Sequence, residues 1–156
     1  MKIVPRFFQY FVAFKECKRN KEVLFVFVPT ILESIKFYNF LSKLNVKSIL
    51  FNSKVNNKQE LFNLIKRKTY KVIITTSILE RGITLEGLNV LIINANHTVF
   101  DHRCLIQISG RVGRKKNHPT GKILLLTNKM NNEIKKAIQD IQKSNSLINH
   151  DDLHNL

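Results

Sequence analysis

The sequence predicts an α/β domain with a mostly parallel sheet that is covered by helices on both sides. Two observations indicate this fold class. Short apolar runs alternate with segments of helical periodicity, and the apolar runs are continuous instead of alternating with polar residues. A continuous apolar run is typical of a strand buried on both faces. Alternation of such strands with helices is typical of a parallel sheet.

Five apolar runs are expected to form the strands, at 22–28, 46–51, 71–75, 89–94 and 122–127. Helices are expected at about 7–20, 31–44, 57–68, 101–112 and 130–143. Thr30 and Glu33 have the spacing of a capping box, and so do Asn57 and Glu60. Asp101 is expected to cap its helix in the same way, through its side chain.

The length of 156 residues suits one domain, and 44% hydrophobic residues suffice for a core. We therefore expect a single domain over 1–156, with an N-terminal helix or interdomain segment at 1–20 and a fraying tail at 145–156. Cys17 and Cys104 are too few for a disulfide framework or a four-cysteine zinc site. No apolar run approaches the roughly 18 residues of a membrane span, so a cytoplasmic protein is expected.

The charge is strongly positive and uneven. Lys and Arg number 26 against 11 Asp and Glu, which gives a net charge of +15. Residues 1–70 hold 14 basic and 4 acidic side chains, a net +10, whereas 71–114 and 115–156 have net charges of only +2 and +3. This distribution favours contact with a polyanion such as nucleic acid, and a solvated basic surface is the alternative.

The stretch QISGRVGR at 107–114 carries the strongest chemical signal. In a helix, Gln107, Arg111 and Arg114 occupy positions i, i+4 and i+7 and so share one face. Gly110 and Gly113 leave room for a ligand to approach the backbone. Two guanidinium groups and an amide on one stripe form a phosphate clamp, and a solvated helix face is the alternative. The opposite face is apolar, with Leu105, Ile108 and Val112.

Two further stretches follow predicted strands. TTSILERGIT at 75–84 offers the Thr76 hydroxyl and a flexible Gly82 for phosphate contact, although turns of this composition are common. VFVPT at 26–30 ends in Thr30, which either caps the next helix or helps to bind an anion at the helix N-terminus.

In this order the three stretches resemble motifs IV, V and VI of the second RecA-like domain of superfamily 2 helicases, over about 20–127. The resemblance implies a RecA-like three-layer α/β/α fold. Within the superfamily, ILERGIT, NANHTVFDHRCLIQISGRVGR and PTGKILLLTN look most like the competence protein ComFA family. Members of that family are DNA-translocating ATPases of DNA uptake, and the primosomal PriA helicases are the next most similar.

The resemblance implies a role for each matching residue. Arg114 would be the arginine finger that reaches the γ-phosphate of ATP, Arg111 would assist it, and Gln107 would couple nucleotide state to domain closure. Gly82, Arg81 and Gly110 would line the nucleotide cleft. Thr30, Ser53 and Thr76 would contact the DNA backbone. Departures from the common pattern at Glu80, Arg81, Thr84 and 52–53 leave the roles of Glu80 and Thr84 open.

Two motifs of a complete motor do not occur in this sequence: a GxxxxGK[ST] phosphate loop and a DExx magnesium motif. We therefore expect half of an enzyme, whose ATP and Mg²⁺ are held mainly by an N-terminal RecA-like domain of the same protein. The implied partners are that domain, single-stranded DNA and a DNA-uptake machinery at the inner face of the membrane. The alternatives are a PriA-like or repair helicase of the same superfamily, or a non-enzymatic basic nucleic-acid-binding module.

Other side chains have ordinary structural interpretations. Phe7, Phe11 and Phe14 at i, i+4 and i+7 are expected to pack in the core, with docking of the first domain as the alternative. The histidines and cysteines share no metal-ligand spacing, so no metal site is expected. Cys104 is expected to be a small packed residue.

Overall fold

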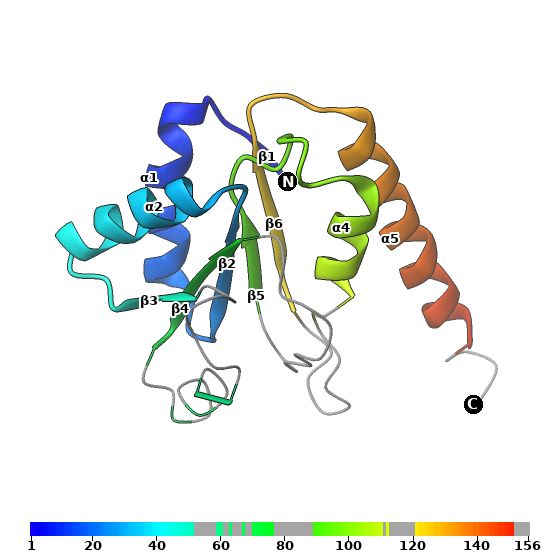
Figure 1. Ribbon diagram of the computed structural model, residues 1–156. Coiled ribbons are helices and arrows are strands. Elements are labelled where there is room, and N and C mark those ends of the chain that lie inside the picture. Colours follow the sequence, from blue (N-terminus) through cyan, green and yellow to red (C-terminus); the bar gives the residue numbers. More distant parts are fainter. Residues whose placement is uncertain are drawn as a thin grey trace.

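The computed structural model describes residues 1–51, 59–60, 63, 67, 70–76, 89–110, 112 and 121–151. A six-stranded sheet with the order β1-β6-β5-β2-β4-β3 forms its centre (Figure 1). Every strand pairs in parallel with its neighbours. The strands are β1 (Lys2–Ile3), β2 (Leu24–Val28), β3 (Ser48–Phe51), β4 (Val72–Thr76), β5 (Asn89–Ile92) and β6 (Ile123–Thr127).

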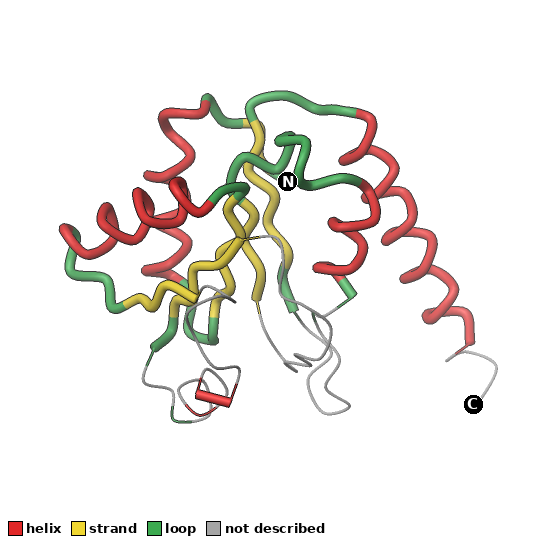
Figure 2. The backbone as a smooth tube through the Cα atoms, in the orientation of Figure 1, coloured by secondary structure: helices red, strands yellow, loops and turns green. Residues whose placement is uncertain are grey.

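Helices cover both faces of this sheet. On one side lie α1 (Arg6–Arg19) and α2 (Ile31–Lys43), and on the other lie α4 (His102–Ser109) and α5 (Asn132–Asp151). Figure 2 shows the strands as a yellow layer between the two pairs of red helices. The predicted RecA-like three-layer α/β/α architecture with a parallel sheet is confirmed.

The pattern of burial explains why the apolar runs are continuous. Phe25 and Phe27 of β2 point into one core cluster with α4 and α5, while Val26 and Val28 point into a second cluster with α1 and α2. All five residues of β2 are buried. A strand between two helical layers needs apolar side chains at both odd and even positions, which is the pattern that the sequence shows.

The structure differs from the sequence prediction at several boundaries. The short strand β1 was not expected, because two exposed residues give no apolar pattern. Helix α5 continues to Asp151, beyond both the expected helix end at 143 and the point where a fraying tail was predicted. The fraying of the last residues stays a prediction. The helix expected at 57–68 lies largely outside the described residues.

The prediction that Phe7, Phe11 and Phe14 pack in the core is wrong for the first two. Phe7 is 78% exposed and Phe11 is 50% exposed, whereas Phe14 is half-buried against α2. The buried face of α1 is formed by Gln9, Ala13 and Cys17. These smaller side chains let the helix approach the sheet closely, and the phenylalanines remain on the outer side.

Candidate functional site

Of the two threonines predicted to contact a nucleic-acid backbone, Thr76 ends strand β4 and Thr30 follows the end of the neighbouring strand β2, at the same edge of the sheet. Val28, the last residue of β2, is paired with Thr76, the last residue of β4. Thr30 follows two residues later and is exposed, while Thr76 is partly buried. The carboxyl ends of two adjacent strands therefore bring these hydroxyl-bearing residues to one edge. Ser53, the third predicted contact, lies outside the described residues.

Thr30 begins α2 as the predicted N-cap. Its Oγ1 accepts a hydrogen bond from the Glu33 backbone N–H at 3.1 Å. The Glu33 carboxylate pairs with the Arg6 guanidinium, and the Tyr10 hydroxyl donates to the Glu33 carbonyl at 3.3 Å. Burial, with a further contribution from the Glu33 charge, raises the pKa of Tyr10. Glu33 thus connects the start of α2 to α1.

Helix α4 carries the first part of the QISGRVGR stretch. Asp101 Oδ1 accepts from the Cys104 backbone N–H at 2.7 Å, which confirms the predicted cap. Leu105 and Ile108 are buried and Val112 packs against the same cluster, as expected for the apolar face. The helix ends at Ser109 with Gly110 as its C-cap, earlier than the predicted 112. The prediction of a polar stripe through residues 107, 111 and 114 assumed that the helix continues beyond Ser109.

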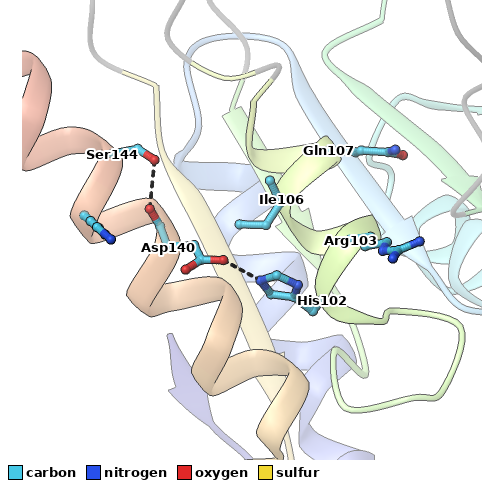
Figure 3. A pocket seen from close by; sticks show the side chains of 7 residues that line it. His102, Arg103, Ile106, Gln107, Asp140 and Ser144 are labelled. Carbon is cyan, nitrogen blue, oxygen red and sulfur yellow. Dashed lines mark hydrogen bonds and ion pairs between the residues drawn. The ribbon is translucent and has the colours of Figure 1, made fainter.

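Gln107 and Gly110 are both exposed. Figure 3 shows Gln107 on the same side of α4 as Arg103, pointing away from Asp140. The other residues assigned to the nucleotide, namely Arg111, Arg114, Arg81 and Gly82, lie outside the described residues. Their roles stay predictions.

The N-terminus of α4 is fastened to α5 by two contacts. The His102 backbone N–H donates to Glu133 Oε2 at 2.8 Å, and His102 Nε2 lies 2.7 Å from Asp140 Oδ2 (Figure 3). A groove of about 590 Å³ runs along this junction. It is lined by His102, Arg103, Ile106, Gln107, Asp140, Lys143 and Ser144. Helix α5 therefore determines how the helix that carries Gln107 is held.

The candidate residues divide between two edges of the sheet. Thr30 and Thr76 follow the carboxyl ends of strands. Helix α4 starts near this edge and runs back along the sheet, so that its C-terminal end lies towards the opposite edge (Figure 1). The expectation that ligands gather at the carboxyl ends fits the threonines only.

Sequence reasoning missed Gln9, a fully buried polar residue of α1. Its Oε1 accepts from the Asn94 backbone N–H at 2.8 Å, and its Nε2 donates to the Val4 carbonyl at 3.1 Å. Asn94 has a left-handed φ of 57° in the turn after β5. Gln9 thus fixes the segment that leads towards α4. The sequence did contain a signal for this role. Gln9 precedes Ala13 by four residues and Cys17 by eight, so it shares a helical face with these two small residues.

The structure describes the surroundings of both cysteines and of His97. Both cysteines are free, and burial raises the pKa of Cys17 to about 12 and that of Cys104, which also faces the Asp101 charge, to about 11. His97 Nδ1 accepts from the Val99 N–H at 3.2 Å. Within the described residues, no three potential ligands gather as a metal site would require. None of the described helices has both the length and the apolarity of a membrane span.

Known proteins are similar to this chain in sequence and in fold. The helicase conserved C-terminal domain model matches residues 5–116. The competence protein ComFA of Streptococcus pneumoniae is 39% identical over 101 residues, which are 65% of this chain and 23% of that protein. The transcription-repair-coupling factor of Helicobacter pylori is 27% identical over 140 residues, which are 87% of this chain and 14% of that protein. The chain therefore spans less than a quarter of the length of these curated relatives.

Among solved structures, the C-terminal domain of the DEAD-box protein Dbp5 superimposes with a TM-score of 0.66 at 20% identity, over 88% of this chain and 78% of that one. This likeness shows the shared fold. The family match covers most of the sequence and includes the VFVPT, TTSILERGIT and QISGRVGR stretches. The predicted resemblance to superfamily 2 helicases and to ComFA is confirmed, and the chain belongs to the helicase conserved C-terminal domain family.

Proposed function

We propose that this chain is the second motor domain of an ATP-dependent DNA translocase similar to ComFA, which drives uptake of single-stranded DNA. The observation that carries the proposal is the family match together with QISGRVGR at the end of α4. In this proposal Arg114 acts as the arginine finger, Arg111 assists it, and Gln107 couples nucleotide state to domain closure. Arg81, Gly82 and Gly110 line the same cleft.

The nucleotide and its Mg²⁺ would be held mainly by an N-terminal RecA-like domain of the same protein. The chemistry of the carboxylates near α4 agrees with this division. Asp101 caps α4, Glu133 accepts from the His102 backbone, and Asp140 faces the His102 ring. These acids serve the helix itself, so we assign no Mg²⁺ ligand to them. The exposed Gln107 amide is suited to a hydrogen bond with a phosphate oxygen of bound ATP.

The nucleic-acid strand would cross the opposite edge of the sheet. Thr30, Ser53 and Thr76 would hold its phosphates through hydroxyl and backbone groups, which implies little base specificity. The exposure of Thr30, and its position two residues after Val28, the register partner of Thr76, support this contact. Changes in the nucleotide cleft would move one edge of a rigid sheet relative to the other domain and so move the bound strand. A location at the cytoplasmic face of the membrane, beside an uptake machinery, belongs to the same proposal.

The decisive experiment uses a longer form of the protein that contains a phosphate-loop domain, with Arg114→Ala. The arginine finger predicts that ATP turnover falls by roughly 10³-fold or more while DNA affinity stays close to that of the wild type. Arg103→Ala is the matched control, because Arg103 is an exposed arginine on α4 itself. A loss of DNA affinity with unchanged ATP turnover would instead indicate a basic nucleic-acid-binding module.

The 156-residue chain alone is expected to hydrolyse no ATP above background, with or without DNA. Its sequence contains neither a phosphate loop nor a DExx motif to bind the triphosphate and Mg²⁺. A coupled phosphate-release assay at high protein concentration tests this. Robust DNA-stimulated turnover by the chain alone would contradict the division of labour proposed here.

A second candidate is the motor domain of a repair helicase. The similarity to the transcription-repair-coupling factor extends over 87% of this chain, more than the 65% covered by ComFA, although at lower identity. Deletion of the gene in its host separates the two candidates. Loss of transformation with normal survival after ultraviolet damage supports the uptake role, and the reverse supports repair.

A further inference from the structure

The outer side of α1 presents an aromatic and basic surface that the proposed motor function does not use. We call it the α1 stripe: Phe7, Phe8, Phe11, Lys15 and Lys18. Phe7, Phe8 and Phe11 are 78%, 51% and 50% exposed. The Phe7 and Phe8 rings lie 4.3 Å apart between centroids. Large apolar side chains gathered on a surface in this way are typical of a binding site.

The exposure follows from how α1 packs. Its sheet-facing side is taken by Gln9, Ala13 and Cys17, and Gln9 is held there by hydrogen bonds to Val4 and Asn94. A rotation that buried Phe7 or Phe11 would break both of these bonds. The stripe is therefore held outwards by the same contacts that dock the helix.

Positive charge accompanies the rings. Lys15 Nζ lies 4.7 Å from the centroid of Phe11, and Lys18 Nζ lies 5.6 Å from that of Phe14. The nearby carboxylates are already in ion pairs: Glu16 with Lys2 at 2.8 Å, and Glu33 with Arg6. The α1 stripe thus combines flat apolar rings with cations, and its acidic neighbours are neutralised.

The stripe also begins beside the proposed nucleic-acid contact. Glu33 joins the two places, because its backbone N–H donates to Thr30 while its carboxylate pairs with Arg6, the residue before Phe7. From Phe7 to Lys18 the helix extends over ~16 Å at 1.5 Å per residue. A strand that leaves Thr30 can therefore continue along α1.

We propose that the α1 stripe is a second binding surface for single-stranded nucleic acid. Bases stack on the exposed phenylalanine rings, and Lys15 and Lys18 contact the phosphates, a combination typical of proteins that bind single strands without sequence preference. The proposal rests on the proposed function in one respect, the continuity with Thr30. It extends the track of the strand to an outer face of the domain.

The chemistry favours a nucleic acid over a protein partner. The only apolar side chains of the stripe are phenylalanines, and its polar members are all lysines. Every base has a ring face to stack on an aromatic side chain, and every nucleotide carries a phosphate for a lysine. A second copy of this chain is tested as the competing occupant.

The chain contains no tryptophan, which allows a direct test. Phe7→Trp places a fluorescent reporter on the stripe, and Leu44→Trp places a control at the exposed far end of α2. Addition of a short oligothymidylate is expected to quench the emission of Phe7→Trp and to leave that of Leu44→Trp unchanged. Equal quenching of both, or of neither, would overturn the proposal.

Affinity provides the second readout, by fluorescence anisotropy of the labelled oligonucleotide. Phe7→Leu with Phe11→Leu keeps apolar area but removes the rings, and should weaken binding about tenfold or more. Phe7→Tyr with Phe11→Tyr keeps the rings and should bind like the wild type. Because Phe7 and Phe11 are exposed, both double variants are expected to fold, which circular dichroism verifies.

The proposal is overturned if the leucine variant binds the oligonucleotide with wild-type affinity. It is also overturned if the wild-type chain binds no oligonucleotide. Gel filtration provides another result that would contradict the proposal. If the wild-type chain is an oligomer and the leucine variant is a monomer, a second copy of the chain covers the stripe. The two proposals fail separately. If Thr30→Ala weakens binding while the leucine variant does not, the motor proposal stands without the stripe. If Arg114→Ala spares ATP turnover while the stripe binds DNA, the stripe stands alone.

Discussion

The imidazole of His102 and the carboxylate of Asp140 lie 2.7 Å apart and join the first residue of α4 to the middle of α5. The same histidine donates its backbone N–H to Glu133, near the start of α5. His102 thus connects α4 to α5 at two positions, one near the start of α5 and one near its middle. Because α5 lies beyond the residues matched by the helicase domain model, this attachment is supplied by the part of the chain outside the family match.

Glu133→Ala is expected to lower the free energy of unfolding more than Asp140→Ala. Glu133 satisfies a backbone N–H in the first turn of α4, and loss of such a cap costs about 1 kcal/mol. The Asp140 side chain is 57% exposed, so its pair with His102 contributes less, in the range of about 0–1 kcal/mol. Urea unfolding measures both, with the exposed Lys136→Ala on α5 as the control. A larger effect at Asp140 would contradict this order.

Truncation to alanine should destabilise the fold strongly at one phenylalanine and hardly at all at another. Phe37 is fully buried in α2 and contacts Tyr10 and Phe40, so Phe37→Ala is expected to cost about 3–5 kcal/mol. Phe7→Ala removes a ring that is 78% exposed and should leave the unfolding midpoint nearly unchanged. Thermal unfolding followed by circular dichroism compares them. A strong destabilisation by Phe7→Ala would show that its ring is buried in solution.

The Thr30 hydroxyl serves as a cap, whether or not it also contacts DNA. Thr30→Ala should destabilise the fold by about 1 kcal/mol, because the Glu33 N–H loses its acceptor. Thr30→Ser keeps the hydroxyl and should preserve both the unfolding midpoint and oligonucleotide affinity. Loss of affinity in Thr30→Ser would mean that the methyl group, and not the hydroxyl, makes the contact.

Among substitutions that keep side-chain volume, Gln9→Met should cause one of the largest losses in the free energy of unfolding. It would leave the Asn94 N–H and the Val4 carbonyl without their buried partner, at a cost of about 1–3 kcal/mol for each group. The exposed Gln139→Met on α5 is the control with the same chemistry. Chemical denaturation distinguishes the two, and equal stability would argue against a structural role for the Gln9 amide.

Cys104 should react slowly with alkylating reagents although it is only partly buried. Burial and the Asp101 charge raise the pKa of its thiol from 9.0 to about 11. At pH 8 this lowers the reactive thiolate fraction by about a hundredfold, and the rate should keep rising with pH until about 11. Iodoacetamide labelling of a Cys17→Ala chain measures the rate. Asp101→Asn can still cap α4 but removes the charge, so it should react faster; an equal rate would leave burial as the sole cause.

The sequence predicted most of the layered fold, because a strand covered on both faces must be apolar at successive positions. The strands from β2 to β6 and the Thr30 and Asp101 caps follow from this pattern and from side-chain chemistry. The orientation of α1 did not follow. Its phenylalanines share a helical face, but periodicity alone does not say whether that face meets the sheet. Close packing through Ala13 and Cys17, with a paired Gln9, decides it.

The candidate site was predictable as a set of residues and less so as an arrangement. Thr30 and Thr76 lie at the same edge of the sheet because β2 and β4 are parallel and both end there, as the strand–helix alternation of the sequence predicts. The C-terminal end of α4 lies towards the other edge because the helix runs back along the sheet, and the expected helical stripe ignored the C-cap at Gly110. Glu133 and Asp140 could not be anticipated, since their partner His102 is 31 and 38 residues away.

The short strand β1 has a consequence for the solubility of the protein. Lys2 and Ile3 pair with Leu126 and Thr127, and the Val4 N–H donates to the Thr127 carbonyl at 2.7 Å. They cover the outer backbone groups of Leu126 and Thr127, the last two residues of β6, which follow the apolar run 123–125. Without this short cover the C-terminal end of β6 would also be an open edge, the kind of surface on which strands of other molecules add and aggregates begin.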